Sequence, residues 1–260
     1  TMTDASEPSQ TEIGIGTYST QNLNVSKYKN GDIIPNIQDN AAWVQADVDG
    51  IGAWCYYDDN LAIGLTYGKL YNRHAVKDPR GLAPHGFTVM SLVDWNNIKD
   101  GSENPPGTPT DAVRLKSAES LGWFPNVGTN STAFNALPGG RRKPTGDFIE
   151  QTSAGVGLYV TGNWWTSDGN YTEATGATVN MTSQNQEVTI NVNPSSPRTL
   201  NANGYSVRLK RDETFNGWNG DPEYLVDKFV KFSYRFKFND NEYSVVAPFS
   251  QDVFIPQQEG

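Results

Sequence analysis

The sequence predicts an α+β domain with long irregular loops, followed by a β-hairpin or β-sandwich segment. Three observations lead to this fold class. From Ile13 onward, short apolar or aromatic clusters are separated by Gly, Asn, Asp and Pro, which is typical of short strands joined by turns. Two stretches have helical spacing, and one long stretch near the C-terminus alternates between apolar and polar residues.

The N-terminal residues 1–11 (TMTDASEPSQT) are small and polar and lack periodicity, so we expect a linker or arm there. The folded domain is expected over residues 12–212. Four of its apolar or aromatic clusters are candidate strands: 53–57 (AWCYY), 65–71 (LTYGKLY), 157–165 and 205–209 (YSVRL).

Residues 89–99 (VMSLVDWNNIK) have the spacing of a short helix, with Thr88 before them as a candidate N-cap. One face of that helix would carry the apolar residues Val89, Leu92, Val93 and Ile98.

A second helix is predicted over 38–46 (QDNAAWVQA), with Asp39 or Asn40 as its cap and Trp43 as its buried ring. Residues 100–110 (DGSENPPGTPT) contain three prolines and two glycines, so they must form a loop.

Residues 170–203 have another composition, rich in Thr, Asn, Ser and Val and almost without charge. Within them, 186–192 (QEVTINV) alternates as a half-buried strand would, and 193–198 (NPSSPR) is a predicted turn.

The C-terminal segment 213–260 has the clearest period-two pattern of the chain. NDNE (239–242) is a candidate hairpin turn, and YSVVAPF after it would be the returning strand. A sheet this short needs partner strands, which we expect from a larger parent chain or a neighbouring subunit. In 229–238 (FVKFSYRFKF) one face would carry Val230, Phe232, Tyr234, Phe236 and Phe238.

The composition of the 260-residue chain restricts its function. A net charge of −9 would be repelled by a phosphate backbone, which argues against nucleic-acid binding. One cysteine, Cys55, and two histidines exclude a disulfide framework and a Cys-rich or multi-histidine metal centre, so we expect no cofactor. No apolar run approaches the length of a membrane span, so membrane insertion is not expected. The start at Thr1 and the stop at QQEG suggest a processed or partial piece of a longer chain.

Several phrases, taken in order, resemble the Fibrobacter succinogenes major paralogous domain, abbreviated FISUMP. They are NLNVSKYKNGDIIPNIQDNAAW (22–43), AWCYYDDN (53–60), YGKLYNRHAV (67–76), RGLAPHGFTV (80–89), FNALPGGRR (134–142), GDF (146–148), NWWTSD (163–168) and GYSVRLKRD (204–212).

The resemblance implies a C-type-lectin-like α+β fold, in which a small twisted sheet and two helices support a long irregular loop region. Such domains are frequent in proteins of Bacteroidetes and, by extension, of their phages. The sequence departs from the family where GFTVMS (86–91) replaces the usual GWHVPT, and where Leu209 replaces a usual Cys.

Residues 227–258 resemble a stretch found in structural proteins of tailed phages, including crAss-like phages. The stretch is typical of a fibronectin-like or immunoglobulin-like β segment. This second resemblance implies that the FISUMP-like domain is an insertion in, or a decoration on, a virion protein.

Asp58 and Asp59 follow an aromatic run. Adjacent residues of a strand point to opposite faces, so the two carboxylates do not form a close catalytic pair. A turn that ends the strand is the favoured interpretation, and calcium bound by one carboxylate with backbone oxygens is the alternative. The EPN and QPD triplets of calcium-dependent lectins are absent.

His74 and His85 are separated by a turn that contains Pro79. With Asp78 they suggest a catalytic base or a metal pair, and a packed or surface histidine is the favoured interpretation of each. No GxSxG or HExxH motif is present.

Trp164 and Trp165 end a Gly-rich strand, so one ring should point inward and the other outward. An exposed ring would stack on a sugar or dock a protein, and the alternative is that both rings belong to the core. Of the adjacent Arg141 and Arg142, one is expected to be structural and one could bind a carboxylate. The candidate ligand-binding residues are Arg141, Asn163, Trp164, Trp165, Thr166, Asp168, Asn170 and Tyr171.

Together these features predict a non-enzymatic surface or virion structural module that binds a glycan or protein receptor and contacts other subunits of a larger assembly. It would be located on a virion, at the cell surface or outside the cell. The alternative is a structural decoration or cementing component of a phage particle with no external ligand. An enzyme is not favoured, because the formylglycine-generating enzyme of the related fold depends on cysteines and Cys55 alone cannot form a pair.

Overall fold

Short strands, short helices and irregular segments alternate along the chain in the computed structural model. It describes residues 8–14, 16–100, 111–118, 122–123, 128–149, 160–169, 177–192 and 201–215, and residues 233, 235, 236, 244 and 248 near the C-terminus. These residues form both helices and several sheets, which confirms the α+β fold class.

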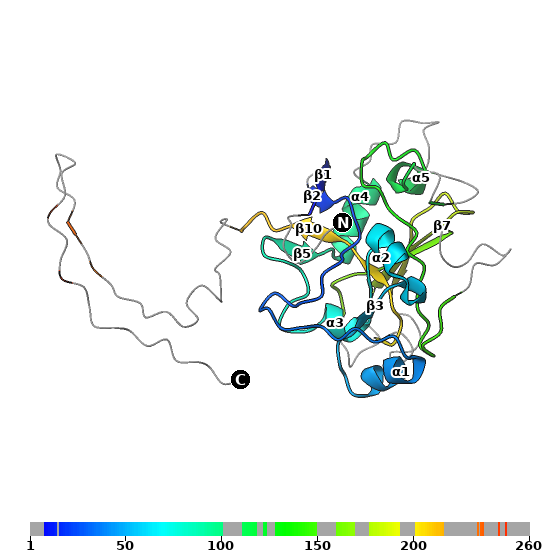
Figure 1. Ribbon diagram of the computed structural model, residues 1–260. Coiled ribbons are helices and arrows are strands. Elements are labelled where there is room, and N and C mark those ends of the chain that lie inside the picture. The colour runs from blue at the N-terminus through cyan, green and yellow to red at the C-terminus, as the bar shows by residue number, and fades with distance from the viewer. Residues whose placement is uncertain are drawn as a thin grey trace. The chain divides into compact units, whose positions relative to one another are not determined.

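Two four-stranded sheets and one two-stranded sheet are present in the described part of the chain (Figure 1). The first sheet is antiparallel, and its strand order is β1 (Gln10–Ile13), β2 (Gly16–Ser19), β10 (Leu209–Arg211) and β5 (Phe87–Val89). The small sheet pairs β3 (Trp54–Cys55) with β4 (Leu70–Tyr71). The other large sheet has the order β8 (Thr189–Val192), β7 (Ala177–Thr182), β6 (Thr161–Trp165) and β9 (Ser206–Val207).

Strand β1 begins at Gln10, so Gln10 and Thr11 of the predicted arm lie in a strand. The candidate strand at 53–57 is shorter than predicted, because β3 ends at Cys55 and the 3-10 turn η1 (Tyr57–Asp59) begins two residues later. The strand predicted over 186–192 is confirmed for residues 189–192.

Helix α1 (Asn40–Val48) confirms the helix predicted over 38–46, with Asp39 as its N-cap and Trp43 fully buried. The Asp39 carboxylate accepts a hydrogen bond of 2.8 Å from the Ala42 backbone N–H. The helix ends in a Schellman motif, in which Gly50 has φ +69° and the Ile51 N–H donates to the Ala46 carbonyl at 2.8 Å.

Helix α2 (Leu61–Tyr67) takes the first three residues of the strand predicted over 65–71, so that prediction is correct only at β4. Asn60 explains the difference, because its side-chain oxygen accepts a hydrogen bond of 2.9 Å from the Ala62 N–H and caps the helix. Gly64 and Tyr67 face the core while Leu61 and Leu65 are exposed, which is a helical period.

Helix α4 (Leu92–Asp100) starts later than predicted, because Thr88 and Val89 belong to β5. The cap is Ser91, whose hydroxyl donates to the Asp94 carboxylate at 2.6 Å and accepts from the Asp94 N–H at 3.2 Å. The predicted apolar face is wrong at Val93, which is exposed, because Trp95 and Ile98 take the buried side. The remaining helices of the described chain are α3 (Arg73–Val76) and α5 (Asp111–Leu115).

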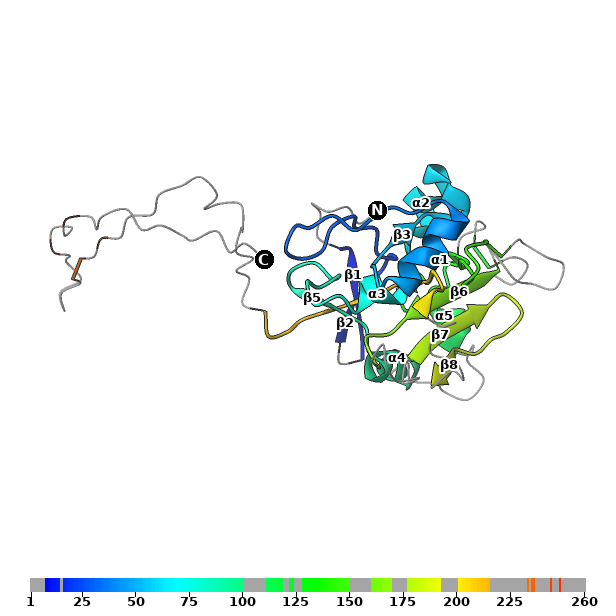
Figure 2. The ribbon, with the colours of Figure 1, turned by 90° about the horizontal axis from the view of Figure 1, so that it is seen from below.

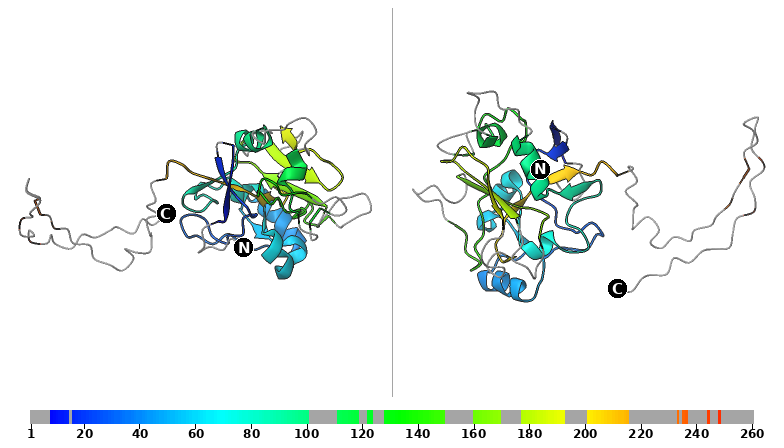
Figure 3. Two further views of the ribbon diagram at one scale, coloured as in Figure 1. Left: turned by 90° about the horizontal axis from the view of Figure 1, so that it is seen from above. Right: turned by 180° about the vertical axis from the view of Figure 1, so that it is seen from behind.

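The candidate strand at 205–209 is two strands of two different sheets, β9 and β10, on either side of Arg208. The chain therefore crosses from one large sheet to the other at this point (Figures 1 and 3). Segments 22–43, 67–76 and 204–209 meet here: the Leu23 N–H donates to the Val207 carbonyl at 2.9 Å, and Tyr71 pairs with Tyr205.

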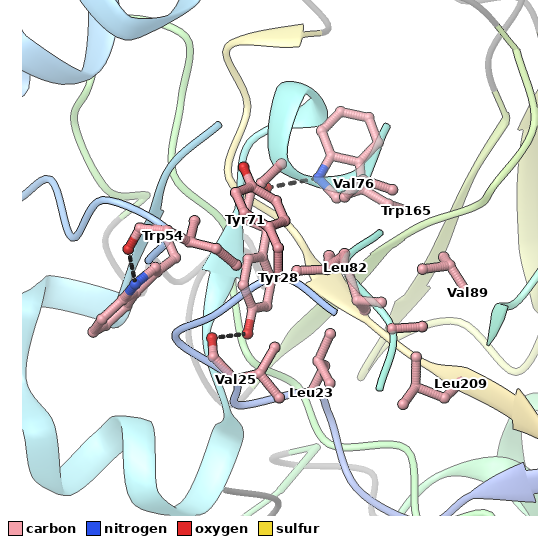
Figure 4. Packing of buried hydrophobic residues seen from close by; sticks show 14 of the residues in the cluster. Leu23, Val25, Tyr28, Trp54, Tyr71, Val76, Leu82, Val89, Trp165 and Leu209 are labelled. Carbon is pink, nitrogen blue, oxygen red and sulfur yellow. Dashed lines mark hydrogen bonds between the residues drawn. The ribbon is translucent and has the colours of Figure 1, made fainter. Parts of the chain in front are cut away.

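Three clusters of buried apolar side chains form the core. The Tyr71 cluster, drawn in Figure 4, takes residues from all three sheets and from α3. It contains Leu23, Val25, Tyr71, Trp165, Val207 and Leu209. The Trp164 cluster is built on Trp95, Trp123, Phe134 and Trp164. The Trp43 cluster joins α1 to α2 and contains Trp43, Ala46, Cys55, Tyr57, Tyr67 and Leu70.

Buried cations connect these clusters. The Arg208 guanidinium is fully buried and donates to the carbonyls of Ser19 (2.8 Å) and Phe134 (3.0 Å) and to Asn22 Oδ1 (2.9 Å). Burial lowers the pKa of Arg208 to about 9. The Lys69 ammonium lies 4.0 Å from the centre of the Trp54 ring and donates to the Asn24 carbonyl at 3.0 Å. These cations therefore bridge backbone segments that lie far apart in the sequence.

The chain divides into two compact units, Thr1–Phe215 and Asn216–Gly260. In the second unit, the Phe236 N–H donates to Ser244 Oγ and the Ser244 N–H donates to the Phe236 carbonyl, both at 2.9 Å. Most of the predicted hairpin, residues 101–110 of the predicted loop and the turn at 193–198 lie outside the described residues, and Asp100 of that loop ends α4 instead. None of the helices in the described part of the chain combines the length and the hydrophobicity that crossing a bilayer requires.

Candidate functional site

The two tryptophans of the predicted ligand-binding set are both fully buried, at 0% exposure. The Trp164 indole N–H donates to Asn22 Oδ1 at 2.9 Å, and its ring packs 5.5 Å from that of Trp95. The Trp165 indole N–H donates to the Tyr71 carbonyl at 2.7 Å (Figure 4). The expectation of an exposed stacking ring at these positions is therefore wrong.

The sheet topology explains this burial. The two rings do point to opposite faces of β6, as adjacent strand residues must. However, β6 lies between β7 and β9, and both faces of the sheet are covered there. Trp164 belongs to the Trp164 cluster and Trp165 belongs to the Tyr71 cluster. Each face of β6 therefore packs against a different part of the core.

Asn163 and Thr166 also use their polar atoms within the fold. The Asn163 amide donates to the Gly140 carbonyl at 3.3 Å, and its oxygen accepts from the Asn180 amide at 3.0 Å. The Thr166 hydroxyl donates to the Ala177 carbonyl at 2.7 Å. Both side chains are buried, so they position strands rather than a ligand.

The loop at 166–169 is the half-buried part of the predicted site. Asp168 Oδ2 accepts a hydrogen bond of 2.5 Å from the Leu92 N–H at the start of α4. The Arg73 guanidinium donates to the carbonyls of Thr166 and Asp168. The Lys77 ammonium donates to the Ser167 carbonyl at 2.9 Å. The loop is thus tied to α3 and α4, and the predicted residues Asn170 and Tyr171 lie outside the described part of the chain.

Burial and the nearby Arg73 lower the pKa of Lys77, and the Asp168 carboxylate opposes that shift. Lys77 is the most accessible of the cations that hold the loop. Its ammonium remains a hydrogen-bond donor to the loop backbone, which fits a positioning role.

Arg141 and Arg142 differ in burial, and one of them is structural, as predicted. Arg142 is fully buried, donates to the Ile37 carbonyl at 2.6 Å and lies 4.5 Å from the centre of the Trp43 ring, so it is structural. Arg141 is half-buried and hydrogen bonds with Tyr205. Gly139 is required nearby, because a Cβ atom there would lie 2.8 Å from Ser206 Oγ.

Asp58 and Asp59 form the tight turn that was predicted, with φ of 53° and 49°. Burial raises the pKa of Asp59, and the Arg142 guanidinium opposes that rise. Asp59 Oδ1 is buried without a hydrogen-bond donor among the described residues. A neighbouring guanidinium disfavours a cation here.

His74 packs against α1, where its Nε2 lies 2.9 Å from Asp47 Oδ1, and His85 is half-buried. Within the described ranges, no three His, Cys, Asp or Glu side chains gather as metal ligands would. Burial raises the pKa of the Cys55 thiol to about 12, so this cysteine is a packed core residue.

The feature that the sequence reasoning missed is the outer surface of α1 and α2. Large apolar side chains are exposed there: Val44, Val48, Ile51, Leu61 and Leu65. A signal was present in the sequence, because residues 31–68 carry six Asp and no Lys, Arg or His. A segment that is acidic throughout and also carries unburied apolar residues is typical of an interaction surface.

Comparison with protein families gave one result. The family model described as Fibrobacter succinogenes major domain matches residues 12–211, which includes every described helix and nearly all of the strands. Neither the curated proteins nor the solved structures include a match to the chain.

Proposed function

The chain belongs to the Fibrobacter succinogenes major domain family, and we propose that its family domain is a non-enzymatic binding module that recognises a protein receptor. It would act on a virion or at the cell surface and would have the C-type-lectin-like fold that the family resemblance implies. The partner would be contacted through side chains that the fold leaves exposed.

One observation carries this proposal: buried arginines are tied to backbone carbonyls, while one segment of the chain exposes several large apolar side chains. The guanidinium groups of Arg73, Arg142 and Arg208 all donate to backbone carbonyls. Six of the nine large hydrophobic side chains that are exposed among the described residues lie within 33–65. Exposed apolar groups concentrated in one segment favour protein recognition over catalysis.

A protein receptor is favoured over a glycan because sugar stacking needs an exposed aromatic face. The aromatic rings predicted for that role, Trp164 and Trp165, are buried. The exposed groups on α1 and α2 are aliphatic instead.

Binding of the fluorescently labelled chain to cells of Bacteroidetes tests the proposal. Cells are treated beforehand with protease or with periodate, which oxidises glycans. We expect saturable binding that protease removes and periodate leaves unchanged. Binding that only periodate removes would contradict a protein receptor and support a glycan.

A structural role is the alternative, and the pattern of residues 229–238 favours it. An extended strand there would place five large apolar side chains on one face. Phe236, the described member of that set, is 65% exposed. A chain that binds no cell but joins a larger particle in sedimentation would support the decoration or cementing role.

A further inference from the structure

We propose that the outer surfaces of α1 and α2 dock a cationic amphipathic helix of a protein partner. This inference rests on the proposed binding function and names the class of partner. We define the acidic apolar face as the apolar side chains Val44, Val48, Ile51, Leu61 and Leu65 with the carboxylates of Asp39, Asp49 and Asp58.

The apolar side chains of this face are not required by the core. The inward side of α1 buries Trp43 and Ala46, and α2 buries Tyr67, all in the Trp43 cluster. The opposite sides remain in solvent, with Val48 at 71% exposure and Leu61 at 59%. Figure 2 shows both helices in the same part of that view, and Figure 1 shows α1 at the lower end of the domain and α2 nearer its middle. Their outer ridges are therefore free to receive a partner.

The spacing of the exposed residues fits a helix as the partner. Ala41, Val44 and Val48 follow one another at intervals of three and four along α1, and Ile51 continues the series after the Schellman turn. This is the spacing of a helix–helix seam. On α2, Leu61 and Leu65 are four residues apart and share one face. A partner helix would place its own apolar side chains between those of α1.

The charge around these residues determines which charge the partner must carry. Residues 31–68 contain six Asp and no basic residue. Three of these carboxylates have a partner within the fold: Asp32 pairs with Arg80, Asp59 is stabilised by the nearby Arg142 guanidinium, and Asp47 Oδ1 lies 2.9 Å from Nε2 of His74.

The other three, Asp39, Asp49 and Asp58, are exposed. An apolar ridge flanked by exposed carboxylates is complementary to a helix with Leu- or Ile-type side chains on one face and Lys or Arg beside them.

The probe for a direct test is a synthetic amphipathic helix of Leu and Lys, and its control is a peptide of the same composition with the apolar face scrambled. Each is titrated into the isotopically labelled 260-residue chain. We expect the amphipathic peptide to shift the amide resonances of residues 39–65 and to bind more weakly as salt is added. The scrambled peptide should bind at least roughly tenfold more weakly, because its apolar side chains cannot be buried together.

Two pairs of valines give a matched test of the site. Val44→Ser with Val48→Ser removes apolar surface from the face, and Val93→Ser with Val192→Ser removes the same side chains at other exposed positions. We expect the first pair to weaken peptide binding roughly tenfold and the second to change it less than about twofold. Circular dichroism and the melting temperature of each variant show whether the fold is intact.

Equal binding of both peptides, or resonance shifts spread away from residues 39–65, would overturn the inference. The cell-binding experiment separates this failure from failure of the proposed function. If the Val44→Ser, Val48→Ser variant binds cells as well as the unchanged chain, the proposed function is supported. The assignment of the acidic apolar face as the binding surface is then wrong. If neither protein binds cells, the receptor-binding function itself is wrong.

Discussion

Lys116 places an ammonium group among backbone carbonyls in the interior of the domain. Its Nζ donates to the carbonyls of Thr182 at 2.8 Å and Asn185 at 2.6 Å, and it lies 5.0 Å from the centre of the Trp123 ring. Burial lowers the pKa of Lys116 from 10.5 to about 8. The charged form is thus less favourable in the folded state than in the unfolded state.

We predict that this shift gives the domain a pH-dependent stability. Between pH 8 and 10.5 the unfolded chain binds more protons at Lys116 than the folded chain does, so the free energy of unfolding rises with pH. Relative to Lys116→Met, the unchanged chain should gain roughly 2–3 kcal/mol across this window. Urea unfolding at several pH values measures the difference. Lys27→Met, at an exposed lysine, is the control variant. A flat difference for Lys116→Met would contradict the prediction.

In helix α2, close packing at Gly64 conflicts with the intrinsic helix propensity of the residue. Gly64 lies inside the helix, where alanine would ordinarily stabilise by up to about 1 kcal/mol. However, a Cβ atom there would lie 1.9 Å from Cδ1 of the Tyr56 ring. The glycine therefore allows the ring and the helix backbone to approach closely.

We predict that Gly64→Ala destabilises the unchanged chain by roughly 1–3 kcal/mol, because the Tyr56 ring must move. In a Tyr56→Ala background the same substitution should stabilise the chain, since the clash is gone and the helix propensity remains. Denaturant unfolding of the four proteins gives the coupling energy. A destabilising effect of the same size in both backgrounds would show that contact with Tyr56 is not the cause.

Sequence patterns predicted those helices and strands whose capping residues and apolar spacing lie within the element itself. Asp39 and Trp43 marked α1 because an N-cap residue shortly before a buried apolar position is a local signal for the start of a helix. The run 65–71 was misread as a strand, since its aromatic and β-branched residues suit a strand, while the cap at Asn60 lies outside it. The division of 205–209 between two sheets depends on Arg208 and on contacts with Ser19 and Phe134, which no local pattern reveals.

The candidate site was predictable only in part for a related reason. The alternation of Trp164 and Trp165 across β6 followed from strand geometry. Their burial depends on side chains that are distant in the sequence, such as Trp95 for Trp164 and Tyr71 for Trp165. The structural role of one arginine of the pair 141–142 was predicted, and the buried one is Arg142. The acidic apolar face could not be predicted, because its position depends on which sides of α1 and α2 pack against the Trp43 cluster.

At the scale of the whole molecule, the described domain is held together without a metal cluster among its described residues. Its clusters are joined by buried cations on backbone carbonyls, such as Arg208 and Arg142. We therefore predict that EDTA and added calcium leave the melting temperature unchanged within about 1 °C. A fall of several degrees in EDTA that calcium reverses would contradict this, and would direct attention to the unpaired oxygen of Asp59.

The central claim is that β6 is an interior strand and that binding belongs to another surface of the domain. Hydrogen exchange of the indole N–H groups of Trp164 and Trp165, assigned by Trp→Phe variants, tests it most directly. Both groups are buried and donate to Asn22 Oδ1 and the Tyr71 carbonyl, so we predict exchange as slow as that of the most protected backbone amides. Exchange of either indole N–H within seconds, in a chain that circular dichroism shows to be folded, would contradict the claim. It would mean that this ring is exposed at the surface.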